Sequence, residues 1–180
     1  MGAIVLTGFM GTGKSEVGRR LATRLGRAFV DTDQLVEREA GKSVAAIFAD
    51  DGEAAFRAHE RDAVTTAAAR RDAVIAVGGG AVLDAANRAR LREAGVVVCL
   101  TASAETILRR VGETTQRPLL AGGEPRAAIE RLLADRRPSY DAVADLTVDT
   151  TDRRPEDVVE EICERVARFE RERQQWKSST

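Results

Sequence analysis

A glycine-rich segment near the start of the chain has the residue types and spacing of a phosphate-binding loop. Residues 8–15 read Gly-Phe-Met-Gly-Thr-Gly-Lys-Ser, which fits G-x-x-x-x-G-K-S/T. The glycines let backbone N–H groups turn toward phosphate oxygens, and the helix that follows adds the positive end of its dipole. We expect a nucleoside triphosphate here, with Lys14 on the β- and γ-phosphates and the Ser15 hydroxyl on Mg²⁺. The loop contacts would come from Gly11, Thr12, Gly13, Lys14 and Ser15. A glycine-rich turn without a ligand is the alternative.

Two carboxylates follow the second apolar run of the chain. Asp31 and Asp33 are two residues apart, and side chains two apart on an extended backbone point the same way. One can hold a metal-bound water while the other accepts a hydrogen bond from a hydroxyl group. The alternative is that the pair only caps the next helix.

Three consecutive glycines, Gly78, Gly79 and Gly80, follow the third apolar run. Because glycine has no side chain, such a segment leaves space and accessible N–H groups, and a small ligand can approach the backbone. A tight turn between a strand and a helix would also explain the three glycines.

Arginine greatly outnumbers lysine, since only three of the 28 basic residues are lysines. Most arginines are expected to be solvated, but a few can bind anions in a planar, bidentate way that lysine cannot reproduce. Arg57 and Glu60 are three residues apart, so Glu60 could steady Arg57, or the two could form an ordinary surface ion pair. Arg136 lies shortly before Pro138, which predicts a helix end there.

The elements that must position these residues alternate along the chain. Nearly continuous apolar runs predict strands at 3–7, 28–31, 73–77, 96–100 and 146–148. Helical periodicity predicts helices at 15–25, 33–40, 43–50, 53–70, 84–94, 103–111, 124–135 and 155–173. This alternation indicates an α/β fold of three layers, with a five-stranded parallel sheet flanked by helices. Ligands of such sheets bind beyond the carboxyl ends of the strands, where the motifs stand.

Length and composition restrict the remaining possibilities. A chain of 180 residues predicts a single domain, 1–180, and a net charge of −1 argues against bulk binding to nucleic acid or an anionic membrane. One histidine is too few for a histidine triad or a multi-histidine metal site. The separated Cys99 and Cys163 favour reduced thiols in a cytoplasmic protein. The N-terminal apolar run favours a short strand over a signal peptide. Helices on both sheet faces favour a monomer.

Two segments stand outside the regular pattern. Residues 112–124 contain flanking glycines and the pair Arg117-Pro118, a composition that fits a mobile lid or an ordinary connecting loop. Residues 174–180 are expected to be a frayed tail.

In combination, the motifs resemble those of the shikimate kinase family. The resemblance covers nearly the whole chain and rests on residues 8–15, 31–33, Phe-Arg-x-x-Glu at 56–60, Gly-Gly-Gly at 78–80, Arg-Pro-Leu-Leu at 117–120 and Arg-x-Pro-x-Tyr at 136–140. It implies a P-loop kinase fold and ATP-dependent phosphorylation of the 3-hydroxyl of shikimate, in aromatic amino-acid biosynthesis. One departure is Ser139, where the family usually has an apolar residue.

The resemblance also implies a role for each matched residue. Asp33 would bind the shikimate hydroxyls and orient or deprotonate the nucleophile, within a helical substrate-binding region at about 32–60. Arg57 and Arg136 would bind the carboxylate, and the glycines at 78–80 would contribute backbone contacts. Asp31 would reach Mg²⁺ through water beside Ser15, and the lid residue Arg117 would contact the transferring phosphate. Arg110, Arg153 and Pro155 would surround the adenine.

Two other functions are the alternatives to this interpretation of the motifs. Gluconate kinase shares the phosphate-binding loop and the size, but it is not expected to carry the 56–60, 78–80 and 136–140 motifs together. A non-catalytic nucleotide-binding module is the second. The Asn-Lys-x-Asp motif of guanine-specific switches cannot be formed, because the sole asparagine, Asn87, precedes Arg88.

Overall fold

Buried aliphatic runs form the five strands of a parallel sheet. The structure is a computed structural model and describes residues 2–112 and 124–178. The strands are β1 (Ala3–Gly8), β2 (Ala28–Asp31), β3 (Ala73–Ala76), β4 (Gly95–Thr101) and β5 (Leu146–Asp149). They pair in the order β2-β3-β1-β4-β5, and every pair is parallel. The predicted α/β architecture is therefore confirmed, and all carboxyl ends meet at one edge of the sheet.

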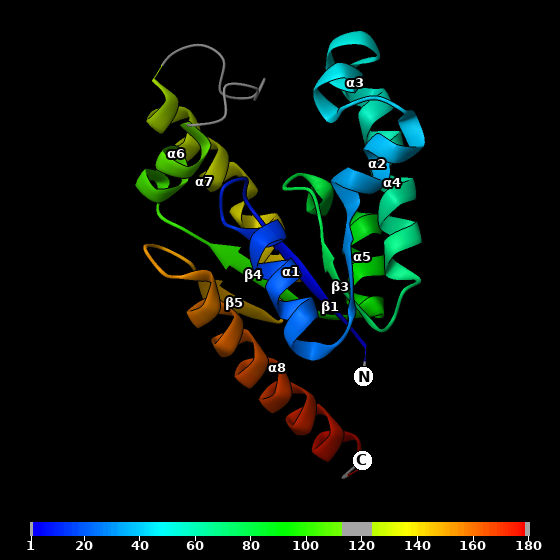
Figure 1. Ribbon diagram of the computed structural model, residues 1–180, viewed down its shortest axis with the longest axis vertical. Helices are drawn as coiled ribbons and strands as arrows, with labels where there is room; N and C mark the ends of the chain where they lie inside the picture. Colours follow the sequence, from blue (N-terminus) through cyan, green and yellow to red (C-terminus); the bar gives the residue numbers. More distant parts are fainter. Residues whose placement is uncertain (1, 113–123, 179–180) are drawn as a thin grey trace.

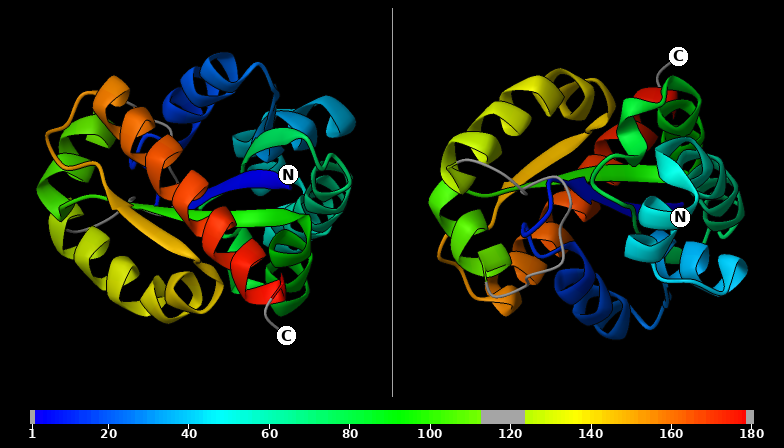
Figure 2. Two further views of the ribbon diagram at one scale, coloured as in Figure 1. Left: turned by 90° about the horizontal axis from the view of Figure 1, so that it is seen from below. Right: turned by 90° about the horizontal axis from the view of Figure 1, so that it is seen from above.

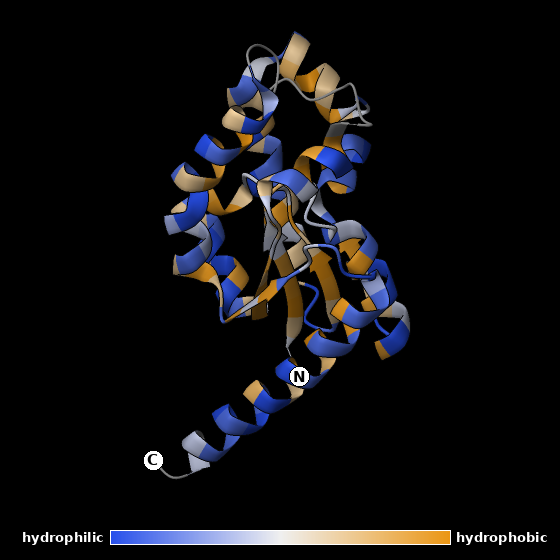
Figure 3. Cartoon of the chain, turned by 90° about the vertical axis from the view of Figure 1, so that its left-hand side faces the viewer, coloured by the Kyte–Doolittle hydropathy of each residue, from blue (hydrophilic) through white to orange (hydrophobic). Residues whose placement is uncertain are grey.

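Helices cover both faces of this sheet (Figure 2). The helices α1 (Lys14–Leu25) and α8 (Pro155–Ser178) pack on one face, against residues such as Ile4 and Leu6. The helices α4 (Gly52–Ala68), α5 (Ala85–Ala94) and α7 (Pro125–Val143) pack on the other face, against the alternate residues Ala3 and Val5. In Figure 3 the strands are mostly hydrophobic, whereas the helices around them alternate between hydrophilic and hydrophobic residues. The continuous apolar strands are explained by burial on both sides.

The remaining elements stand around the carboxyl edge of the sheet. Helices α2 (Thr32–Ala40) and α3 (Val44–Asp50) follow β2, a short 3₁₀ helix η1 (Ala81–Leu83) follows the glycine segment, and α6 (Ala104–Gly112) follows β4. In Figure 1 the α2–α3 end and the α6–α7 end rise on opposite sides of this edge. No helix within the described residues is long and apolar enough to cross a membrane.

Two predicted helix ends were wrong. Helix α7 does not stop before Pro138 but continues through it to Val143. A proline inside a helix costs about 3 kcal/mol, and here the burial of Tyr140 and Val143 beyond it offsets that cost. Helix α8 continues to Ser178, so residues 174–178 are helical instead of frayed, and the Ser178 hydroxyl donates to the Gln174 carbonyl at 2.7 Å. The predicted lid, with Arg117, lies outside the described residues apart from its end positions 112 and 124.

Candidate active site

The loop between β1 and α1 has the backbone conformation of a phosphate-binding loop. Gly8, Gly11 and Gly13 have φ angles of +136°, +75° and +90°, values that side-chain-bearing residues rarely adopt. Helix α1 begins at Lys14 without a side-chain cap, so its first N–H groups can bind an anion. The Lys14 ammonium reaches across the loop and donates to the carbonyls of Gly8 (2.9 Å) and Phe9 (2.8 Å). Positive charge is thereby concentrated at the mouth of the loop.

Ser15 and Asp31 bring two oxygen donors together beside this loop. The Ser15 hydroxyl donates to Asp31 Oδ2 at 2.7 Å, and Asp31 Oδ1 accepts from the backbone N–H of Asp33 at 3.0 Å. Asp31 therefore caps α2, as the alternative reading expected, and it also lies beside the phosphate loop; its role toward a metal-bound water stays a prediction. Among the described residues, no group of three or more His, Cys, Asp and Glu side chains is placed to hold a metal unaided.

A small pocket gathers the residues that the sequence singled out for an acceptor molecule. Its volume is about 110 Å³, which suits only a small ligand. The predicted residues that line it are Asp33, Arg57, Gly78, Gly79, Gly80 and Arg136, and they are joined by Met10, Phe48, Phe56 and Glu60.

A second pocket of about 230 Å³ lies along the phosphate loop, and it meets the first. Seven of its lining residues are predicted ones: Gly11, Gly13, Lys14, Ser15, Asp31, Asp33 and Gly79. Met10, Asp33 and Gly79 line both pockets. A phosphate donor in one pocket and an acceptor in the other would therefore be neighbours, with the Asp33 carboxylate at the boundary.

The glycine segment gives space to the charged groups of the acceptor pocket. A Cβ atom at Gly78 would lie 2.7 Å from Asp33 Oδ1, and one at Gly80 would lie 2.5 Å from Arg57 Nη1. Neither position tolerates a side chain without displacing its neighbour. The backbone N–H of Gly78 donates to the buried hydroxyl of Thr32 at 3.0 Å. Thr32 is not among the predicted site residues, and its position between the two aspartates was the only signal in the sequence.

Arg57 is held by two glutamates of its own helix. Its Nη1 donates to Glu60 Oε2 at 2.7 Å, and its Nη2 donates to the exposed Glu53 at 3.1 Å. Glu60 is only 2% exposed, and its Oε1 has no hydrogen-bond partner among the described residues. Burial raises the pKa of Glu60, and the hydrogen bond from Arg57 opposes that rise. The predicted support of Arg57 by Glu60 is thus confirmed, and it is not an ordinary surface pair.

Arg136 is the most buried arginine of the pocket, at 7% exposed. Its guanidinium lies over the Phe9 ring, 5.4 Å from the ring centroid, a distance that allows a cation–π contact. Within the described part of the chain, no carboxylate oxygen is within 4.0 Å of this guanidinium. A buried, solvent-poor guanidinium of this kind is suited to bind the carboxylate of a ligand.

Of the residues expected around an adenine, Arg110 contacts the phosphate loop, whereas Arg153 contacts α8. Arg110 donates to the Gly11 carbonyl (3.1 Å) and the Thr150 carbonyl (2.8 Å), so it lies against the phosphate loop. Arg153 donates to the Asp149 carbonyl (3.0 Å) and to Glu161 (2.5 Å), so its guanidinium is held by the end of β5 and by α8. Pro155 is the first residue of α8. The loop after β5 thus lies beside the phosphate loop, but Arg153 is turned toward Glu161.

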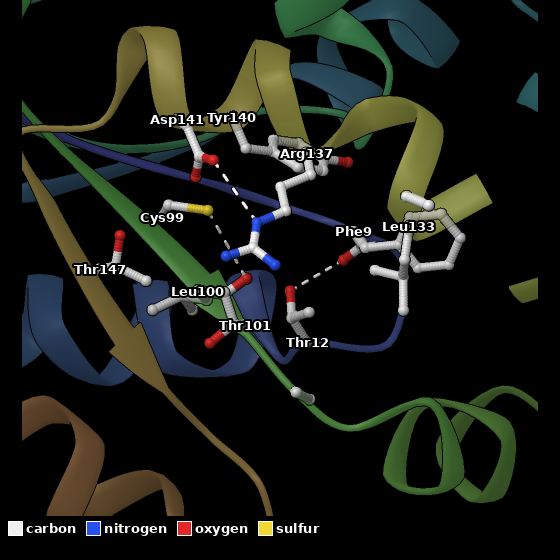
Figure 4. A pocket seen from close by; sticks show the side chains of 12 residues that line it. Phe9, Thr12, Cys99, Leu100, Thr101, Leu133, Arg137, Tyr140, Asp141 and Thr147 are labelled. Atoms are coloured by element: carbon white, nitrogen blue, oxygen red, sulfur yellow. Dashed lines mark hydrogen bonds and ion pairs between the residues drawn. The ribbon is translucent and has the colours of Figure 1, made fainter. Parts of the chain in front are cut away.

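Thr12 supports the phosphate loop from within. Its hydroxyl is buried and donates to the Phe9 carbonyl at 2.8 Å. The residue faces a pocket of about 550 Å³, which lies beneath α7 beside β4 and β5 (Figure 4). It is not among the residues that line the phosphate-loop pocket. A contact of Thr12 with a nucleotide would therefore come from its backbone.

A phosphate-binding loop next to a small pocket with two arginines and an aspartate defines a class of protein. This class comprises the kinases that transfer a phosphoryl group from a nucleotide to a small anionic acceptor. The family model for shikimate kinase matches residues 10–167. The shikimate kinase of Caldanaerobacter subterraneus subsp. tengcongensis is 50% identical over 159 residues, which cover 88% of this chain and 92% of that protein.

Solved structures agree with this assignment. Shikimate kinase from Acinetobacter baumannii, solved in complex with shikimate, superposes with a TM-score of 0.90 at 37% identity and covers 94% of both chains. A gluconokinase from Sinorhizobium meliloti shares the fold at a TM-score of 0.61 and 22% identity, covering 98% of this chain and 97% of that one. The chain belongs to the shikimate kinase family, and its fold is that of P-loop kinases.

Proposed function

We propose that this protein transfers the γ-phosphoryl group of ATP to the 3-hydroxyl of shikimate, giving shikimate 3-phosphate and ADP. The reaction serves aromatic amino-acid biosynthesis. The observation that carries the proposal is the junction of the two pockets at Asp33 and Gly79. An acceptor hydroxyl at that junction would face the end of a triphosphate held by the phosphate loop.

Shikimate would be bound by its carboxylate and hydroxyl groups. The guanidiniums of Arg57 and Arg136 line one pocket and can bind a carboxylate by charge-assisted hydrogen bonds. The glycine segment at 78–80 brings accessible backbone next to these arginines, where a ligand hydroxyl can bind. Asp33, at the boundary with the phosphate loop, would orient the 3-hydroxyl and accept its proton.

Phosphoryl transfer depends mainly on positioning and charge stabilisation. Lys14 would bind the β- and γ-phosphates, together with the N–H groups of the loop and of the start of α1. Arg117, which lies outside the described residues, would contact the transferring phosphate on the basis of its sequence motif alone. Arg110 and Pro155 would border the adenine, and Arg153 would contribute only after exchanging its contact with Glu161.

The residues beside the phosphate loop fit Mg²⁺. Mg²⁺ prefers oxygen ligands and is usually held by one or two protein groups together with substrate phosphates and water. The Ser15 hydroxyl and the Asp31 carboxylate supply such oxygens, 2.7 Å apart. Bound Mg²⁺ would neutralise charge on the phosphates. We further propose a monomer, which the helical cover on both sheet faces supports. The separated cysteines favour a cytoplasmic location, and the net charge of −1 argues against nucleic-acid or membrane partners.

An ADP-release assay with four acceptor conditions tests the proposal. Purified protein with ATP and Mg²⁺ should release ADP rapidly with shikimate, and only at a background rate with quinate, gluconate or no acceptor. Chelation with EDTA should stop release, and added Mg²⁺ should restore it. Equal release without an acceptor would indicate a simple ATPase, and preferential release with gluconate would favour the other kinase of this fold.

A further inference from the structure

Tyr140 connects α7 to the glycine segment of the acceptor pocket. It is the only tyrosine of the chain and is 6% exposed. Its hydroxyl donates a hydrogen bond of 2.7 Å to the carbonyl oxygen of Gly79. This contact joins residues 61 positions apart in the sequence.

The same face of α7 carries Arg136. Because α7 continues through Pro138, Arg136 and Tyr140 stand four residues apart on one continuous helix and therefore on one face. Arg136 lines the acceptor pocket, with its guanidinium over the Phe9 ring, and Tyr140 donates to Gly79, which lines the same pocket. One helical turn thus fixes the distance between a predicted carboxylate ligand and the glycine segment.

The carbonyl that Tyr140 holds belongs to the peptide between Gly79 and Gly80. In a planar trans peptide the C=O and N–H groups point in opposite directions. A hydroxyl from α7 on the Gly79 carbonyl therefore directs the Gly80 N–H away from α7. Glycine has little intrinsic preference for one orientation of this peptide, so an external contact is needed to fix it.

The Tyr140 hydroxyl remains a proton donor under ordinary conditions. Burial raises its pKa to about 12, although the nearby positive charge of Arg136 acts in the opposite direction. The residue also borders the large pocket beneath α7, together with Phe9 and Leu133 (Figure 4). Replacement by phenylalanine would therefore remove one hydrogen bond without crowding the neighbours.

We propose that Tyr140 is a positioning residue for the acceptor: its hydroxyl holds the Gly79–Gly80 peptide in the orientation that binds shikimate, in register with Arg136. This inference rests on the proposed function, since it assumes that the acceptor occupies the pocket lined by Gly79 and Arg136.

The test compares steady-state kinetics of Tyr140→Phe with wild type and with Arg136→Ala. Loss of a hydrogen bond worth about 0.5–1.5 kcal/mol should raise the KM for shikimate roughly two- to twelvefold. The KM for ATP should stay within about twofold of wild type. An unchanged KM for shikimate, or equal increases in both KM values, would overturn the positioning role even if the melting temperature falls.

Arg136→Ala distinguishes a wrong role for Tyr140 from a wrong assignment of the acceptor pocket. If Arg136→Ala weakens shikimate binding and Tyr140→Phe does not, only the role of Tyr140 is wrong. If neither variant changes the KM for shikimate, the acceptor pocket itself is misassigned, and the role of Tyr140 is wrong with it.

A second measurement uses the wild-type protein and needs no variant. Because the chain has one tyrosine, protein labelled with [¹³Cζ]tyrosine gives a single side-chain signal from Tyr140. Addition of shikimate without ATP should change the chemical shift of this signal. The change should reach its maximum at the shikimate concentration that saturates binding in calorimetric titration. A signal that stays unchanged at saturating shikimate would contradict the proposal.

Discussion

Arg57 Nη1 donates a hydrogen bond of 2.7 Å to Oε2 of Glu60, and the glutamate that accepts it is almost completely buried. The second oxygen of Glu60 faces Gly78 and would lie 3.1 Å from a Cβ atom there. Arg57 therefore receives its orientation from a carboxylate inside the protein, while Glu53 supports it from the solvent side.

The burial of Glu60 predicts a pH dependence of stability. Its raised pKa means that the folded state binds the proton more tightly than the unfolded state does. The corresponding stabilisation is complete below the ordinary pKa, 4.5, and is lost as pH rises through the folded pKa. The unfolding free energy of wild type minus that of Glu60→Gln should therefore fall from about pH 4 to pH 7.

Chemical denaturation of both proteins across this range measures the difference. Glu53→Gln, which changes the exposed partner of the same arginine, is the matched control. The prediction is wrong if the unfolding free energy of wild type minus that of Glu60→Gln stays constant or grows toward neutral pH. Burial would then not be the dominant influence on the pKa of Glu60.

Arg136 and its neighbour Arg137 form a natural pair of test and control. Arg136 is buried in the acceptor pocket, whereas the Arg137 side chain is 81% exposed. Arg136→Ala should cost about 2–5 kcal/mol in shikimate binding, roughly 30-fold or more in Kd. Arg137→Ala should leave Kd within about twofold. Calorimetric titration with shikimate gives both values, and comparable affinities for the two variants would rule out the carboxylate-binding role of Arg136.

The glycine segment allows binding and catalysis to be perturbed separately. An alanine at position 80 would displace the Arg57 guanidinium, so Gly80→Ala should mainly raise the KM for shikimate. An alanine at position 78 would press on the Asp33 carboxylate, so Gly78→Ala should mainly lower kcat. Steady-state kinetics of the two variants give both constants. Equal changes in kcat and in the KM for shikimate in the two variants would contradict the separate roles of Arg57 and Asp33.

Arg117→Ala tests the motif that lies outside the described residues. If this arginine stabilises charge on the transferring phosphate, kcat should fall by about 100-fold or more. The Kd for shikimate should stay nearly unchanged. Arg126→Ala, at an exposed arginine that pairs with Glu130, is the control. Turnover equal to that of the control would exclude a catalytic role for Arg117.

The sequence predicted the sheet and most of the residues that line the two pockets, because the informative residues directly follow apolar strands. Asp31, at the end of β2, and Gly78, just after β3, had to meet at one edge once the sheet was parallel. The glycine spacing of residues 8–15 specified the phosphate loop without any tertiary information.

Contacts between distant segments could not be predicted in the same way. The bond from Tyr140 to Gly79 depends on α7 continuing through Pro138, and the local rule for proline predicted a break. Packing of the residues beyond the proline overrides that rule. The pairing of Arg153 with Glu161 likewise depends on the start of α8 at Pro155. Sequence spacing does not determine how this helix is oriented relative to the loop that contains Arg153.

The proposed function requires that the γ-phosphoryl group passes to one particular hydroxyl of shikimate at the junction beside Asp33. The most direct measurement is ³¹P–¹H correlation NMR of the product formed from shikimate and ATP, with ADP quantified in the same sample. We expect one product, with phosphorus coupled to the hydrogen at carbon 3, in an amount equal to the ADP. Phosphate on another hydroxyl, or ADP without phosphorylated shikimate, would contradict the proposed function.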